Sequence, residues 1–135
     1  MNLTKKDEEL IEKAKALVGE KKVSGGVVKE VGSALLTKEG EIFTGANLDL
    51  WCGIGFCAEH SAIANMISHS DETQIDTIVA VYYDEKEERF KIIPPCGRCR
   101  EMMELVDKRN RENTNVIVSE NKKMKLEELL PAEWI

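Results

Sequence analysis

The sequence predicts an α/β protein with three layers, α-β-α, in which helices cover both faces of a mixed central sheet. Segments with helical spacing of apolar residues alternate with short β-branched runs, an order typical of a sheet covered by helices. The run at residues 75–82 is almost continuously apolar, as expected for a central strand buried on both faces. A chain of 135 residues is long enough for one hydrophobic core, so we expect a single domain over residues 1–135.

The first half of the chain is expected to contain two helices and a hairpin. Apolar residues at helical spacing predict an amphipathic helix over residues 5–18. Two strands, at residues 31–37 and 41–45, flank the turn sequence Lys-Glu-Gly, which indicates a β-hairpin. Residues 46–56 contain Asn, Asp and Gly and are predicted to form an irregular loop. Helical spacing returns over residues 58–68.

The second half is expected to add three strands and two helices. After the central strand at residues 75–82, a charged turn leads to a strand at residues 90–93, which two prolines end. A helix is predicted over residues 97–109 and a strand over residues 115–118. A short helix at residues 126–130 stops near a proline.

Charge and hydropathy limit the classes of partner. The net charge is −6, whereas a protein that binds polynucleotides is usually basic, so we expect a small-molecule ligand and no nucleic acid partner. No apolar run approaches the roughly 20 residues that span a bilayer, and the N-terminal segment is too charged for a signal peptide. We therefore expect a cytoplasmic protein without membrane contact, whose four cysteines stay reduced.

Three of the cysteines lie in two local patterns that indicate a metal site. The patterns are Cys57-Ala58-Glu59 and Pro95-Cys96-Gly97-Arg98-Cys99-Arg100, each placed where a strand or loop leads into a predicted helix. A helix N-terminus stabilises a thiolate, and thiolates are good zinc ligands. Three sulfurs would leave the fourth position of a tetrahedral zinc open for water, which is the pattern of a catalytic site.

Glu59 supplies the second part of the predicted chemistry. It lies two residues from Cys57 and is expected to face the same cavity without binding the metal. Zinc lowers the pKa of a bound water to about 7, and a nearby carboxylate can accept its proton and pass it to a leaving group. Arg98, between two ligands, is expected to donate hydrogen bonds toward the sulfurs. The combination suits hydrolytic deamination of an amino-substituted ring.

These segments resemble the cytidine deaminase superfamily, which combines Cys-Ala-Glu with a downstream Pro-Cys-x-x-Cys. The likeness extends to residues 31–36, 45–49 and 129–134 and so covers most of the chain. It implies the family's three-layer fold, a role in pyrimidine salvage and, as in the small three-cysteine members, a homotetramer. It also implies that Cys57, Cys96 and Cys99 bind Zn²⁺, and that Glu59 shuttles protons while hydroxide on the zinc attacks C4 of the cytosine ring and ammonia leaves.

The same resemblance implies the substrate contacts. The backbone of Ala58 would bind the ring carbonyl, and Asn47 would contact a ribose hydroxyl. Asp49 stands where cytidine deaminases usually have the longer Glu. Trp134 stands where they have an aromatic residue that reaches the base pocket of a neighbouring subunit.

Three departures from the family pattern bear on the choice of nucleoside. Lys29 stands where the family often has a Phe that forms a wall of the base pocket. His60 stands where many members have an Arg that helps to neutralise the thiolates, and Arg98 resembles the arrangement in blasticidin S deaminases. Cytidine or 2′-deoxycytidine is the first expectation, and a blasticidin S-type aminonucleoside antibiotic is the alternative.

Two other interpretations of the cysteines remain open. Cys57, His60, Cys96 and Cys99 would together make a closed Cys₃His site, as in a non-catalytic interaction domain that zinc stabilises. That arrangement leaves Glu59 without a role; in the catalytic interpretation, His60 instead lies beside the ligands and donates to a thiolate. A thioredoxin-like redox pair at residues 96 and 99 leaves Cys57 unused.

Overall fold

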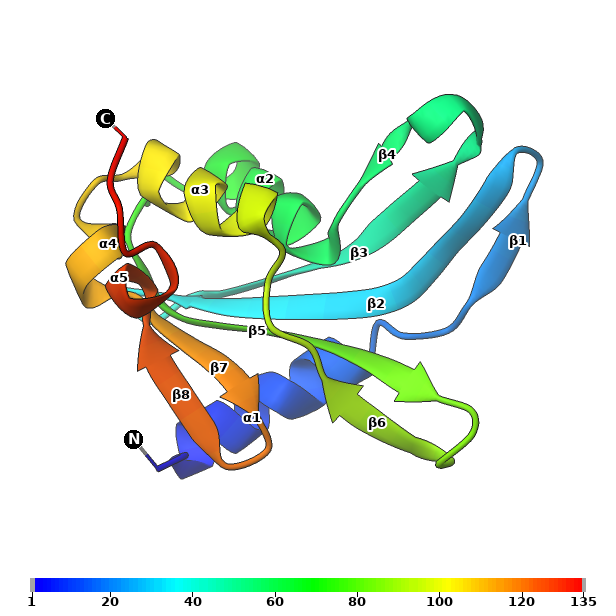
Figure 1. The fold of residues 1–135 in the computed structure, drawn as a ribbon, viewed down its shortest axis with the longest axis horizontal. Coiled ribbons are helices and arrows are strands. Elements are labelled where there is room, and N and C mark those ends of the chain that lie inside the picture. The colour runs from blue at the N-terminus through cyan, green and yellow to red at the C-terminus, as the bar shows by residue number, and fades with distance from the viewer. Residues whose placement is uncertain (1, 135) are drawn as a thin grey trace.

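A computed structural model describes residues 2–134 of the chain as a mixed α/β fold (Figure 1). The helices are α1 (Lys5–Lys15), α2 (Ala58–His69), α3 (Gly97–Val106), α4 (Asn110–Asn113) and α5 (Leu126–Leu129), with a 3₁₀ turn, η1, at Trp51–Gly53. The strands are β1 (Lys21–Val23), β2 (Gly26–Thr37), β3 (Ile42–Leu50), β4 (Gly55–Phe56), β5 (Ile75–Asp84), β6 (Arg89–Ile92), β7 (Asn115–Ser119) and β8 (Lys122–Lys125).

All of these strands belong to one sheet with β2 and β5 near its centre. The order is β4-β3-β2-β5-β7-β8, while β1 pairs with β2 and β6 pairs with β5. The β5–β7 pair is parallel, and the other pairs are antiparallel. The sheet is therefore mixed, as the sequence predicted.

Helices cover the two faces of this sheet, which gives the predicted three layers (Figure 1). On one face, α2 and α3 pack over the sheet around a core of Leu35, Ala62, Ile63, Met66, Ile75, Ile78, Cys99, Met103, Val116 and Leu126. On the other face, α1 packs around Leu10, Ile11, Ala14, Ala34, Leu36, Val79, Val81 and Ile117. The predicted burial of the central strand on both faces is confirmed, because β5 contributes side chains to both clusters.

The ends of α1 follow from local chemistry. Thr4 caps the helix in a capping box with Asp7, each side chain accepting a hydrogen bond from the other residue's backbone N–H. The buried Asp7 carboxylate also pairs with Lys123 of β8 at 2.7 Å, which ties α1 to the edge of the sheet. The predicted helix over 5–18 ends early, because the backbone N–H of Gly19 donates to the carbonyl of Lys29 and draws the chain toward β2.

The predicted loop at residues 46–56 is wrong. Strand β3 continues to Leu50 in register with β2, with Asp49 opposite Val27, and β4 returns beside it after η1. Asn, Asp and Gly have low strand propensity, but pairing with a long neighbouring strand overrides that weak preference. The lysine-rich strands β1 and β8, which the sequence did not predict, likewise pair with a neighbouring strand, β2 and β7 respectively.

Among residues 2–134, no helix combines the length and the apolar character that a membrane crossing requires.

Candidate active site

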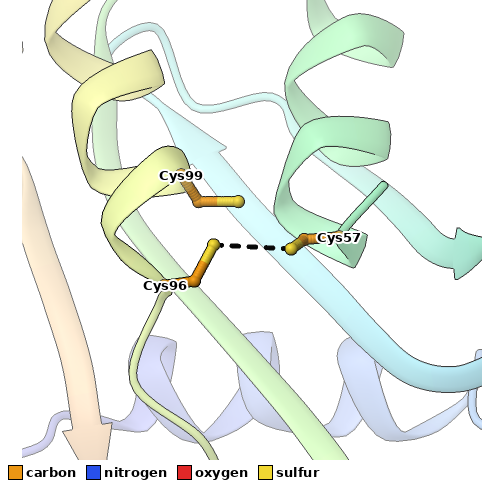
Figure 2. A group of neighbouring side chains, drawn as sticks. All are labelled: Cys57, Cys96 and Cys99. Atoms are coloured by element: carbon orange, nitrogen blue, oxygen red, sulfur yellow. Dashed lines mark hydrogen bonds between the residues drawn. The ribbon is translucent and has the colours of Figure 1, made fainter. Parts of the chain in front are cut away.

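The starts of two helices bring three cysteines together (Figure 2). Cys57 is the N-cap residue of α2, Cys96 is the N-cap residue of α3, and Cys99 lies in the first turn of α3. Their Sγ atoms lie within 4.8 Å of one another, and those of Cys57 and Cys96 are 3.4 Å apart. The side chains of Figure 2 point toward one another from two separate helices.

The three thiols differ in their tendency to ionise. Burial raises the pKa of Cys99 far above its usual range, and the neighbouring charges of Glu59 and the other sulfurs add to the effect. Burial also raises the pKa of Cys57. Burial opposes ionisation of Cys96 too, but hydrogen bonds from the Cys99 backbone N–H and the two other thiols outweigh it and lower its pKa. A cation among the sulfurs would offset the cost of ionising all three.

This donor set fits zinc. Three clustered sulfurs are soft ligands of the kind that zinc prefers, and in residues 2–134 the cluster has no fourth Cys, His, Asp or Glu. His60 is engaged elsewhere: its ring stacks on Phe56 with centroids 4.3 Å apart, and its Nδ1 accepts a hydrogen bond from Arg98 at 2.9 Å. The geometry thus favours an open three-sulfur site over the closed Cys₃His arrangement.

Arg98 does not make the contact that the sequence suggested. Its guanidinium donates to the ring of His60, and no hydrogen bond joins it to a sulfur in residues 2–134. Burial and the charge of Arg98 lower the pKa of His60. His60 accepts from Arg98 through Nδ1 and so orients it, and the donation of His60 to a thiolate stays a prediction.

Glu59 lies beside the sulfurs in the first turn of α2. Only 5% of the residue is exposed, and burial raises the pKa of its carboxyl group, partly opposed by a hydrogen bond from its own backbone N–H. It lines the same cavity as Cys57 and Cys96. A carboxyl group with a raised pKa is suited to accept and return a proton.

The cavity in front of the cysteines has a volume of about 680 Å³, within the range of small-molecule sites. Asn47, Asp49 and Ala58, for which the resemblance implied substrate contacts, line this cavity. Val31 and Phe56 form apolar walls that the sequence analysis missed. Phe56 directly precedes Cys57 in the sequence. Its position at the cavity follows from the short strand β4, which the sequence did not predict.

Asn47 has a structural task that the sequence did not predict. Its Oδ1 accepts hydrogen bonds from the backbone N–H groups of Glu30 and Val31, at 2.8 and 2.9 Å. These groups lie where the β2–β3 register shifts between Val28 and Gly32. The orientation of the amide is therefore fixed, and its Nδ2 donates to the Glu30 carboxylate at 3.3 Å.

Two other predicted residues lie apart from the cavity. Trp134 is 68% exposed, its indole N–H donates to Glu101 of α3, and it does not line the cavity of its own chain. Lys29 is exposed with a φ of 63° at the irregular part of β2, where it forms no wall. The suggested contact of Trp134 with a neighbouring subunit stays a prediction.

The fold and the three-cysteine site agree with the resemblance to the cytidine deaminase superfamily, and so does comparison with known proteins. Residues 4–121 match the family described as "Cytidine and deoxycytidylate deaminase zinc-binding region". The chain therefore belongs to the cytidine and deoxycytidylate deaminase family.

Individual relatives give the same picture. The chain is 39% identical over 77 residues to a blasticidin-S deaminase of Bacillus cereus, a match covering 54% of each chain. It is 36% identical over 75 residues to a cytidine deaminase of Halalkalibacterium halodurans, covering 55% of this chain and 52% of the relative. The chain thus spans about half the length of the curated relatives it matches. The crystal structure of cytidine deaminase from Mycobacterium tuberculosis aligns over 95% of this chain and 96% of its own, with a TM-score of 0.73 and 20% identity, which confirms the fold.

Proposed function

We propose that residues 1–135 form one zinc-dependent domain that hydrolytically deaminates cytidine or 2′-deoxycytidine to the uridine product and ammonia. The observation that carries the proposal is the convergence of Cys57, Cys96 and Cys99 beside the buried Glu59, at the end of a cavity large enough for a nucleoside. In keeping with the family, we further propose a cytoplasmic homotetramer that acts in pyrimidine salvage.

The three cysteines would hold the metal, and bound zinc supplies a water of lowered pKa. The chain's own residues would transfer the protons and bind the ring. Glu59 would accept a proton from the attacking water and deliver it to the ring nitrogen, and it would then pass a second proton, from the hydroxyl group added at C4, to the amino group, which leaves as ammonia. The backbone of Ala58 would bind the ring carbonyl, and Phe56 and Val31 would hold the ring between apolar surfaces.

The sugar would lie toward Asn47 and Asp49. Oδ1 of Asn47 is held by two backbone donors, and one hydrogen of its Nδ2 by the Glu30 carboxylate. The second hydrogen of Nδ2 would donate to a ribose hydroxyl. Asp49 would accept from a second hydroxyl. Arg98, oriented by His60, would place a positive charge at the rim of the cavity near the sulfurs.

An absorbance assay over cytidine, 2′-deoxycytidine, blasticidin S and adenosine tests the proposal. We expect loss of cytosine absorbance with one of the two cytosine nucleosides as the best substrate. Best activity on blasticidin S would support the alternative, a blasticidin S-type aminonucleoside deaminase, which the 39% identity to the Bacillus cereus enzyme favours. No turnover of any cytosine compound by zinc-loaded protein would refute both.

Metal removal separates this proposal from a structural zinc site. We expect the protein to stay folded without zinc, because the core beside α1 contains no proposed ligand and the core beneath α2 and α3 has Cys99 as the one proposed ligand among its buried apolar side chains. Far-UV circular dichroism after chelation should be nearly unchanged, while activity is lost and returns when zinc is added back. Unfolding on chelation would instead identify a domain whose folding depends on zinc.

A further inference from the structure

His60 lies between two side chains that line the candidate active site. Phe56 of β4 and Arg98 of α3 both line the cavity in front of the cysteines, whereas His60, in the first turn of α2, does not. The imidazole ring nevertheless contacts both of them, because it stacks on Phe56 and accepts a hydrogen bond from Arg98. His60 thus joins a wall of the cavity to a positive charge at its rim, although it does not itself line the cavity.

The contact with Phe56 is a stack of two rings. Their centroids are 4.3 Å apart and their planes differ by 20°, an arrangement in which aromatic rings attract each other. Phe56 belongs to a strand of only two residues, and backbone pairing in so short a strand does not fix the rotamer of a side chain. The imidazole face therefore restricts the rotation of the Phe56 ring at the cavity.

The contact with Arg98 fixes the direction of a charge. A guanidinium group has donors only, so Nδ1 of His60 must be the acceptor of this hydrogen bond, which is 2.9 Å long. In residues 2–134, Arg98 makes no ion pair and no hydrogen bond to a sulfur. The imidazole is therefore the group that orients the guanidinium.

This orientation leaves donors for a ligand. The guanidinium carries five N–H groups, and the bond to His60 uses one of them. Cys96 and Cys99 flank Arg98 in the sequence, and ionised sulfurs would attract a guanidinium that nothing else held. Among the described residues that line the cavity, Arg98 is the only cation, and the carboxyl groups are those of Asp49 and Glu59. Arg98 is thus the charged donor available to the oxygen atoms of a nucleoside.

We propose that His60 is a positioning residue for substrate binding, which holds the Phe56 ring against the base and the Arg98 guanidinium toward an oxygen atom of the nucleoside. The inference rests on the proposed function, since it takes a nucleoside to occupy the cavity. A side chain outside the cavity thus determines the affinity for the substrate inside it.

Two substitutions separate the two contacts of His60. His60→Asn keeps an acceptor for Arg98, because Oδ1 of asparagine lies as far along the side chain as Nδ1 of histidine, but it has no ring to stack on Phe56. His60→Phe keeps a ring but has no acceptor. We expect KM for the best cytosine substrate to rise about threefold in His60→Asn and about tenfold in His60→Phe. In both variants kcat should change by less than about twofold, because lost binding that is equal in the ground state and the transition state raises KM alone.

A double substitution tests whether His60 acts through Arg98. Arg98→Gln should raise KM about tenfold or more, and adding His60→Phe should raise it no further, because the guanidinium that His60 orients is already gone. His69→Phe is the matched control: it makes the same change at an exposed position at the other end of α2, outside the cavity, and should leave KM unchanged. Zinc content is measured for every variant, so that loss of metal is not taken for loss of affinity.

Equal KM values in the wild type and His60→Phe would overturn the inference and leave the proposed function intact. Full addition of the effects of His60→Phe and Arg98→Gln would overturn it as well, since His60 would then not act through Arg98. If the wild type deaminates no compound, the proposed function fails, and calorimetric titration of the zinc-loaded protein with cytidine decides the inference separately. Equal Kd values in the wild type and His60→Phe, or no binding by either, would refute it.

Discussion

Glu59→Gln is expected to lower kcat by two to four orders of magnitude, the contribution of a positioned proton-transfer group, without reducing zinc content or stability. Glutamine has nearly the shape of glutamate but cannot accept and return a proton. The carboxyl group is 5% exposed and its pKa is raised by burial, so its charge contributes no stability to the fold. The free energy of unfolding should therefore stay the same or rise.

Glu104→Gln provides the matched control. Glu104 is also buried, 2% exposed, but its carboxylate pairs with Arg111 at 3.1 Å. Removing that charge leaves a partly buried guanidinium with a weaker partner and should cost about 2 kcal/mol of stability, with kcat little changed. Turnover is measured by cytosine absorbance and stability by urea unfolding. If zinc-loaded Glu59→Gln turns over substrate about as fast as the wild type, Glu59 has no part in the mechanism.

The metal cluster and Glu59 were predictable because their placement is local. A Cys-x-x-Cys at a helix start directs two sulfurs to one point whatever the rest of the fold does. Cys57 and Glu59 are two residues apart at the start of another helix, so the local sequence places them together. The sequence needed only one long-range assumption, that the two helix starts meet, and the family resemblance supplied it.

The walls and the sugar side of the cleft were not predictable in this way. The contact of Asn47 with Glu30 and Val31 spans 17 and 16 residues and depends on an irregularity in the β2–β3 register. Because the predicted loop hid the continuation of β3, nothing in the local pattern placed Glu30 beside Asn47. A neighbouring cavity that shares Val31 likewise needs the β5–β6 hairpin and the segment after α1 in their final positions.

Gly45→Ala is expected to destabilise the protein by about 3 kcal/mol, at the upper end for overpacking a core. Gly45 lies in β3 under the first turns of α2. A Cβ built on it would stand 2.3 Å from the backbone nitrogen of Ala62 and 2.6 Å from the carbonyl carbon of Ser61. A flexible side chain can relieve such a clash by changing its rotamer, but the backbone atoms of a packed helix cannot. Helix α2 must therefore move away from the sheet.

That movement should reach the active site, because Cys57 and Glu59 lie at the start of the same helix. Zinc affinity measured with a competing chelator should fall together with the urea midpoint, although Gly45 touches neither the metal ligands nor the cavity. Gly19→Ala is the control: a Cβ there meets no atom within 4 Å, and both quantities should stay at their wild-type values. Wild-type stability and zinc affinity in Gly45→Ala would mean that α2 is not held against β3 as closely as the structure describes.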